Sequence, residues 1–143
     1  MNNVIEVFRQ TPVPDVNNMN LSVSDLSGAL KELLNRPDWP DDCADRPDLV
    51  YQEADRFVEF TGGAWKMEGI DQSYYDYDFE RERYNPSMCY EASIKCAHFG
   101  TGAHRRSDSP VLTLATALIE ALVHAMVADE TNDAAHADID TAI

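Results

Sequence analysis

One segment limits what this chain can fold into more than any other feature. Residues 110–128 follow Ser109, whose hydroxyl can cap a helix, and begin with Pro110, which the first helical position tolerates. Apolar side chains surround nearly the whole circumference of the helix expected there: Val111, Leu112, Leu114, Leu118, Ile119, Leu122, Val123, Met126 and Val127. Such a helix either lies at the centre of the core or buries its second face against another subunit. Between these alternatives, we predict a homodimer formed through residues 110–128.

The remaining pattern predicts a layered α/β domain. The spacing of apolar residues and the capping signals indicate helices over residues 22–35 and 48–60. Residues 64–70 and 88–97 are expected to be strands, the second because apolar and polar residues alternate along it. Residues 98–109 contain two glycines and are expected to form a loop. The expected fold class is therefore α/β (α+β), a layered sandwich of a small, mostly antiparallel sheet with packed helices.

The chain has 143 residues, which suits one domain with tails. Residues 1–20 combine a short apolar stretch with prolines and asparagines, and we expect an N-terminal strand or arm followed by a linker. Residues 21–128 form the expected single domain. Residues 129–143 carry acids and neither Lys nor Arg, so we expect an acidic, frayed C-terminal tail.

The charge balance excludes several classes of partner. Acidic residues outnumber Lys and Arg by 26 to 11, which gives a formal net charge of -15. This charge repels nucleic acid and anionic membranes, so we expect neither direct nucleic-acid binding nor membrane binding. The sequence shows neither a charge-free run of 18 apolar residues nor a secretory signal. Three cysteines without such a signal favour reduced thiols and a cytoplasmic location.

Two short motifs resemble a family of small phage proteins. They are Ser24-Asp25-Leu26-Ser27-Gly28-Ala29-Leu30 and Asp108-Ser109-Pro110-Val111-Leu112-Thr113-Leu114-Ala115. Both are similar to the helix starts of the phage ABA-sandwich, or NinX-like, family, and the likeness covers roughly two-thirds of the chain. The tryptophan that follows the first motif in that family is absent, since Lys31-Glu32-Leu33 stands there. The resemblance implies a layered α/β fold and a phage protein acting inside a bacterial host cell, but it implies no activity.

The segment 74–84 (YYDYDFERERY) is the first candidate site. In an extended strand, four carboxylates project from one face at steps of about 6.6 Å: Asp76, Asp78, Glu80 and Glu82. Tyr75 and Tyr77 project from the other face and add contact area. A row of carboxylates can substitute for phosphates in the basic groove of a nucleic-acid-binding protein. The alternatives are a solvated edge strand whose charges prevent aggregation, or a cation site.

A second acidic cluster lies in the proline-rich loop over residues 36–47. Its acids are Asp38, Asp41, Asp42 and Asp45, followed by Asp48. We include Asp41, Asp42 and the neighbouring Trp39 among the expected partner contacts, because tryptophan often anchors a loop in its own core or in a partner. The alternative is a solvated loop.

Three further groups of residues are candidate ligand or metal sites. Gly100-Thr101-Gly102 with His104, Arg105 and Arg106 can hold a phosphate if the glycines make a turn before the next helix. Cys89, Cys96, His98 and His104 have zinc-compatible side chains but no closed zinc spacing, and a buried Cys96 with an exposed Cys89 is the simpler interpretation. Glu120 and His124 are four residues apart and are expected to form a helix pair.

These observations favour a non-enzymatic protein. We predict a phage-type inhibitor, such as an anti-defence or anti-CRISPR protein, that binds a host protein by acidic mimicry of nucleic acid. We expect no cofactor, no metal and no catalytic residue. The alternative is a protein that binds or sequesters an anionic nucleotide through His104, Arg105 and Arg106.

Overall fold

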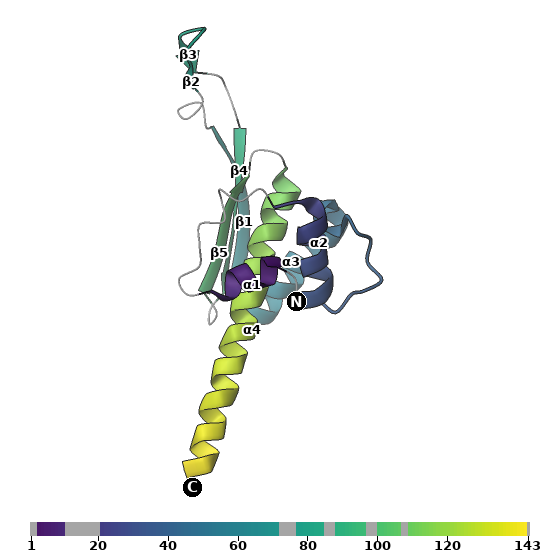
Figure 1. The fold of residues 1–143 in the computed structure, drawn as a ribbon, viewed down its shortest axis with the longest axis vertical. Helices are drawn as coiled ribbons and strands as arrows, with labels where there is room; N and C mark the ends of the chain where they lie inside the picture. Colours follow the sequence, from purple (N-terminus) through teal and green to yellow (C-terminus); the bar gives the residue numbers. More distant parts are fainter. Residues whose placement is uncertain are drawn as a thin grey trace.

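The computed structural model describes residues 3–10, 21–71, 77–84, 88–96, 100–106 and 109–142. Its helices are α1 (Asn3–Arg9), α2 (Val23–Leu33), the 3-10 helix η2 (Cys43–Asp45), α3 (Pro47–Thr61) and α4 (Pro110–Ala142). Its strands are β1 (Ala64–Asp71), β2 (Tyr77–Asp78), β3 (Arg83–Tyr84), β4 (Met88–Cys96) and β5 (Gly100–Arg106) (Figure 1). Strands β1, β4 and β5 form an antiparallel sheet in the order β1-β4-β5, and β2 pairs with β3. The expected α+β fold with packed helices is confirmed.

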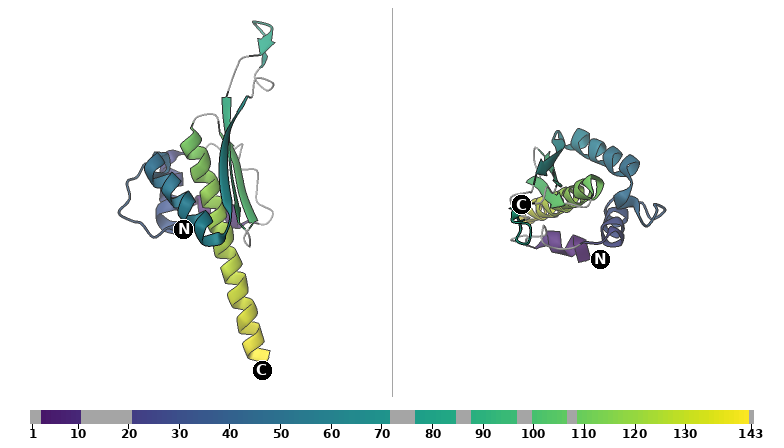
Figure 2. Two further views of the ribbon diagram at one scale, coloured as in Figure 1. Left: turned by 180° about the vertical axis from the view of Figure 1, so that it is seen from behind. Right: turned by 90° about the horizontal axis from the view of Figure 1, so that it is seen from above.

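Helix α4 occupies the centre of the domain. The sheet strands β4 and β5 lie on one side of it and helices α1, α2 and α3 lie on the other (Figure 2). Every residue from Val111 to Ile119 is buried. Of the two sequence-based alternatives for this helix, the structure therefore has the central core helix, and the homodimer stays a prediction.

Capping interactions explain where the helices begin and end. The Ser22 hydroxyl accepts a hydrogen bond from the Asp25 backbone N–H at 3.1 Å, as the sequence indicates for the start of α2. The Ser109 hydroxyl accepts one from the Leu112 backbone N–H at 3.3 Å. Gly62 ends α3 in the left-handed conformation, with a φ of 72°. The predicted helices over 22–35 and 48–60 and the predicted strands over 64–70 and 88–97 are confirmed.

The core also contains polar groups, and each has a hydrogen-bond partner. Thr113 and Thr116 donate to backbone carbonyls one turn earlier in α4, at 2.7 and 2.8 Å. The Ser27 hydroxyl of α2 accepts from the Ala44 backbone N–H of η2 at 3.0 Å. This bond fixes η2 against α2 and thereby holds one end of the acidic loop.

The ends of the chain are helical where the structure describes them. The segment expected to be an N-terminal strand or arm contains helix α1, and not a strand, because Val4, Ile5 and Phe8 lie on one helical face and are buried in the core. The backbone of the expected acidic tail continues α4 as one helix to Ala142, and fraying of this segment stays a prediction. Figure 1 shows this outer part of α4 leaving the body of the domain.

The expected loop over residues 98–109 is also wrong, because Gly100–Arg106 form strand β5. The strand pairs with β4 from Tyr90 opposite Arg106 to Cys96 opposite Gly100. Pairing with β4 and packing on α4 thus override the local preference of glycine for turns.

The sequence has no charge-free run of 18 apolar residues, yet among the described residues one helix has the length and composition to cross a membrane. Residues Pro110–Glu130 have a mean hydropathy of 2.0, and 61% of that window is buried inside the fold. The central position of α4 accounts for this apolar composition.

Gly63 is required where α3 turns into β1. A Cβ atom at this position would lie 1.9 Å from the Lys95 carbonyl oxygen of β4. We predict that Gly63→Ala lowers the free energy of unfolding by about 1–3 kcal/mol, because backbone atoms must move to admit the methyl group. Urea unfolding measures this loss.

Gly62→Ala is the matched control, because a Cβ atom there meets nothing within 4 Å and only the positive φ is unfavourable. It should cost about 1 kcal/mol. A Gly63→Ala protein as stable as the wild type would contradict the close approach of Gly63 to the Lys95 carbonyl of β4.

Candidate functional site

Within the segment expected to be an extended strand over 74–84, the described residues 77–84 form a hairpin. Tyr77–Asp78 pair with Arg83–Tyr84, and the four residues between them make the turn. Glu82 has a φ of 52°, in the left-handed region that turns use. The expected row of carboxylates along one strand face is therefore wrong, because the chain reverses within it.

The individual residues of that row are placed as follows. Glu80 and Glu82 are exposed in the turn. Tyr75 and Asp76 lie outside the described residues. Tyr77 and Asp78 have their backbone in β2, and their side chains lie outside the description.

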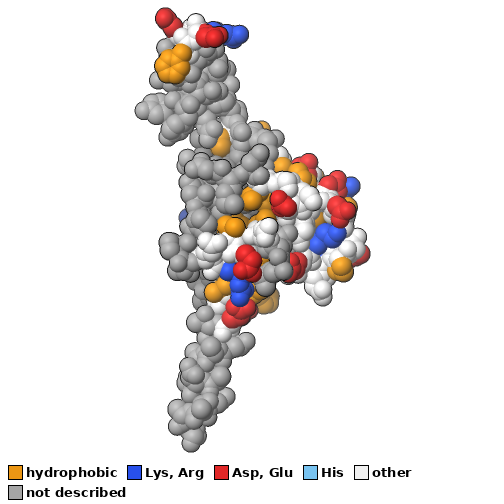
Figure 3. All heavy atoms as spheres, viewed as in Figure 1, with side chains coloured by type: hydrophobic (Ala, Val, Ile, Leu, Met, Phe, Trp, Pro, Cys, Tyr) orange, Lys and Arg blue, Asp and Glu red, His pale blue; other side chains and the backbone are white. Residues whose placement is uncertain are grey.

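The tip of this hairpin has no surplus of negative charge. Glu80 and Glu82 alternate with Arg81 and Arg83, and all four side chains are exposed. Phe79 at the same tip is 84% exposed. Figure 3 shows hydrophobic, acidic and basic side chains together at the end of the molecule that the β2–β3 hairpin forms. The tip therefore offers an aromatic ring among balanced charges rather than a substitute for a phosphate backbone.

Two acids of the 36–47 loop lie in ion pairs. Asp41 contacts the Lys31 ammonium at 2.9 Å, and Asp42 contacts the Arg46 guanidinium at 2.8 Å. The hydrogen bond from Arg46 lowers the pKa of Asp42 below its ordinary value. Trp39 is half-buried and packs against the hydrophobic core, so it anchors the loop in its own domain. These pairs reduce the negative field that the loop presents.

Sequence reasoning missed a polar contact between α3 and β1. The Trp65 indole N–H donates to the Asp55 carboxylate at 2.9 Å, and the Trp65 and Tyr51 ring centroids are 5.5 Å apart. The three residues meet because the chain turns at Gly62 and Gly63 and brings β1 back beside α3. Spacing along the sequence gives no signal for this contact, since it depends on that turn.

The acidic residues expected in the tail from residue 129 have their backbone in α4 as far as Ala142. Asp129 and Glu130 are exposed where the helix leaves the body, and Glu130 is held by Arg9 of α1 at 3.0 Å. The sequence then continues through Asp133, Asp138 and Asp140 without Lys or Arg. Acids near a helix C-terminus oppose the helix dipole, and the sequence from Asp133 to Asp140 has neither Lys nor Arg to balance these three.

The expected glycine turn for an anionic ligand does not form. Gly100 and Gly102 lie within β5, whose backbone is paired with β4. His104 is opposite Ala92 in that ladder, and Arg105 and Arg106 follow it along the strand. The side chains of these three residues lie outside the description.

The cysteine pattern differs from the expectation. Cys89 is buried and Cys96 is half-buried, the reverse of the sequence-based interpretation. The Cys89 thiol turns back onto its own strand and donates to the Tyr90 carbonyl at 3.6 Å, whereas Cys96 lies at the end of β4. Within the described residues, no three His, Cys, Asp or Glu side chains gather as a metal site, and His98 lies outside those residues.

The expected helix pair in α4 is observed. The His124 Nε2 atom lies 4.0 Å from the Glu120 Oε1 atom, and both side chains are mostly buried.

Comparisons of the chain with protein-family models, with curated proteins and with solved structures find no match. The resemblance to the phage ABA-sandwich family therefore depends on the two short motifs, and the phage setting stays an expectation. In the structure both motifs are helix starts that pack in the core. The surface of the molecule is therefore the remaining evidence for its function.

Burial raises the pKa of the Cys43 and Cys96 thiols, although the neighbouring Ser27 and Thr61 side chains act in the opposite direction. A raised pKa leaves less thiolate at neutral pH, and the thiolate is the reactive form. We predict that the folded protein reacts with a disulfide reagent more slowly than free cysteine at pH 7. The rate should keep rising to a higher pH than it does for free cysteine.

Cys96→Ser is the informative variant, because Cys43 is fully buried and Cys96 is not. It should remove most of the slow reaction of the folded protein, while denaturation should expose the remaining thiols. Rapid reaction at pH 7 in the folded state would contradict the assigned burial.

Proposed function

We propose that this protein is a non-enzymatic, phage-type inhibitor or adaptor that docks on the cationic nucleic-acid-binding surface of a host protein. The observation that carries the proposal is the outer part of α4, where the sequence places five acids without Lys or Arg while the helix leaves the domain. The rest of the described surface supports it, since nearly all described acidic side chains are exposed. The exceptions are Glu53, Glu91 and Glu120.

The geometry of a helix makes the comparison with nucleic acid quantitative. Residues 129–140 rise over about 17 Å at 1.5 Å per residue and carry five acids; Glu130 is paired with Arg9, so the remaining four give about one negative charge per 4 Å. One strand of B-DNA carries a phosphate about every 3.4 Å along its axis. A groove that holds a phosphate backbone can therefore meet a similar linear charge density along α4.

The other acidic segments fit this role less well. The hairpin tip alternates Glu with Arg, and the 36–47 loop holds two of its acids in ion pairs. The nucleotide-binding alternative loses its main support, since the glycines that were to cradle a phosphate lie in a paired strand. We therefore place the electrostatic contact on the outer part of α4.

Displacement of host proteins from immobilised DNA tests the proposal. We predict that the chain releases one or a few proteins of a bacterial lysate from the DNA and forms a stoichiometric complex with them. Release should occur at roughly 50 mM NaCl and be lost at roughly 500 mM, because salt screens contacts between exposed charges. The variant Asp133→Asn, Asp138→Asn, Asp140→Asn should weaken release at least tenfold.

The matched control is Asp38→Asn, Asp48→Asn, Glu59→Gln, which removes the same charge from exposed positions elsewhere. It should retain most of the activity. Equal losses in the two variants would mean that only total charge matters, and no loss in the α4 variant would reject mimicry by this helix.

A further inference from the structure

Strand β1 is an edge of the three-stranded sheet. It pairs with β4 along residues 64–71, and among the described residues no strand pairs with its other side. Ala64, Lys66, Glu68 and Gly69 of this strand are exposed. The outer edge of a strand eight residues long therefore carries a row of backbone N–H and C=O groups that can pair with another strand.

Lys66 and Glu68 balance each other's charge on this edge. They lie two residues apart on the same face of the strand, and their side chains are 66% and 61% exposed. They contact each other at 3.3 Å. A lysine ammonium has three donors and a carboxylate has two acceptor oxygens, so this ion pair can bind a second pair beside it without giving up its own contact.

Antiparallel pairing of β1 with the β1 strand of a second copy brings two such ion pairs together. A register in which one residue lies opposite itself keeps the helices of both copies on the same side of a continuous sheet, because side chains alternate between the faces. Centring the pairing on Lys66 or on Glu68 sets two like charges opposite each other, which is unfavourable. Centring it on Met67 sets Lys66 of each copy opposite Glu68 of the other.

The other face of β1 fits the same register. Trp65 and Met67 are half-buried and pack against the hydrophobic core, whereas Gly69 has no side chain. With Met67 at the centre, Trp65 of each copy lies opposite Gly69 of the other, where the missing side chain leaves room for the indole. Aromatic side chains that cover glycines of edge strands are a known device for fixing register. Size and charge along β1 are therefore both complementary to a second β1.

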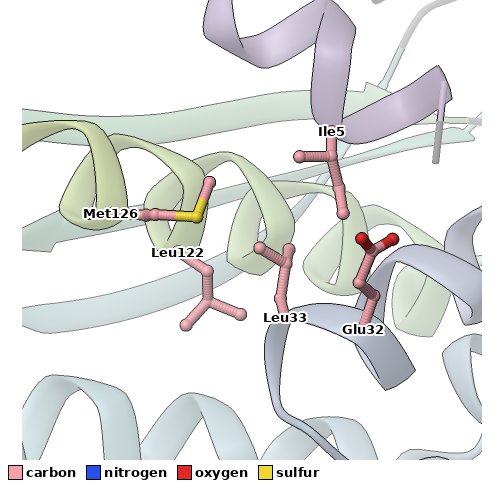
Figure 4. Close-up of a pocket in the computed structure, with 5 residues that line it drawn as sticks. All are labelled: Ile5, Glu32, Leu33, Leu122 and Met126. Carbon is pink, nitrogen blue, oxygen red and sulfur yellow. The ribbon is translucent and has the colours of Figure 1, made fainter. Parts of the chain in front are cut away.

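The groove between α1, α2 and α4 is a weaker candidate for an interface. It has a volume of about 330 Å³ and is lined by Ile5, Glu32, Leu33, Leu122 and Met126 (Figure 4). Its one carboxylate, that of Glu32, already has an interaction within the chain. The lining therefore selects no particular occupant, whereas the edge of β1 selects a second copy of itself.

We propose that two copies of this chain pair through their β1 strands, antiparallel and centred on Met67, so that the two three-stranded sheets become one sheet of six strands. In such strand addition, backbone hydrogen bonds supply the affinity and side chains supply the specificity. Exposed ion pairs contribute little energy, so Lys66 and Glu68 select the register and the partner. The contact is independent of the proposed function and differs from the dimer predicted through residues 110–128.

Charge reversal on one or both copies tests the proposal by analytical ultracentrifugation. The wild type should dimerise at roughly 150 mM NaCl, where salt screens the repulsion between two chains of net charge -15. Lys66→Glu and Glu68→Lys should each weaken dimerisation at least tenfold, because each sets like charges opposite each other. An equimolar mixture of the two variants should form a 1:1 heterodimer, since every charge then meets its opposite.

Lys95→Glu and Glu59→Lys are the matched controls, because they make the same changes in charge at exposed positions of β4 and α3. Both should dimerise as the wild type does. Thermal unfolding checks the fold of each variant, and the rescue in the mixture shows independently that neither single variant is misfolded.

A wild-type chain that stays monomeric at roughly 100 μM would overturn the proposal. So would a mixture of the two charge variants that forms no heterodimer. A dimer that both variants retain would place the interface elsewhere, and its loss in Met126→Gln would place it at the groove. Release of host proteins from DNA does not depend on this contact, so its failure would reject the nucleic-acid mimicry and leave the dimer standing.

Discussion

Burial of the first half of α4 is the interaction on which the rest of the structure depends. Leu114, Leu118 and Ile119 are fully buried, and each such side chain contributes about 1.5–3 kcal/mol relative to an exposed one. The sheet and the three N-terminal helices cover opposite sides of this helix. Neither layer can bury its own apolar face without α4 between them, so the sandwich is held together from its middle.

The sequence alone was enough to predict the elements whose ends or faces are determined by their own side chains. Ser22, Gly62 and Ser109 mark helix ends, and alternation marks β4. Strand β5 could not be predicted, because its glycine-rich sequence favours a turn and only pairing with β4 makes it extended. Helix α1 was missed for a related reason: its short apolar run fits a strand or a helix, and packing on α4 decides between them.

The candidate surfaces could be predicted less well than the fold. Charge composition is visible in the sequence, but its distribution depends on turns that reverse the chain, as the hairpin around Glu80 does. The Asp55–Trp65 contact and the groove at Met126 join elements that are distant in sequence, so no local spacing indicates them. The outer part of α4 is recognisable as acidic from the sequence, but its composition resembles that of disordered tails and gives no signal that the helix continues to Ala142.

The order of the chain gives the central helix a consequence for synthesis. Helix α4 is synthesised after α1, α2, α3, β4 and β5, yet all of these elements pack against it. The nascent chain therefore displays unpaired apolar faces until residues 110–123 have emerged, and the two layers can close only after that point.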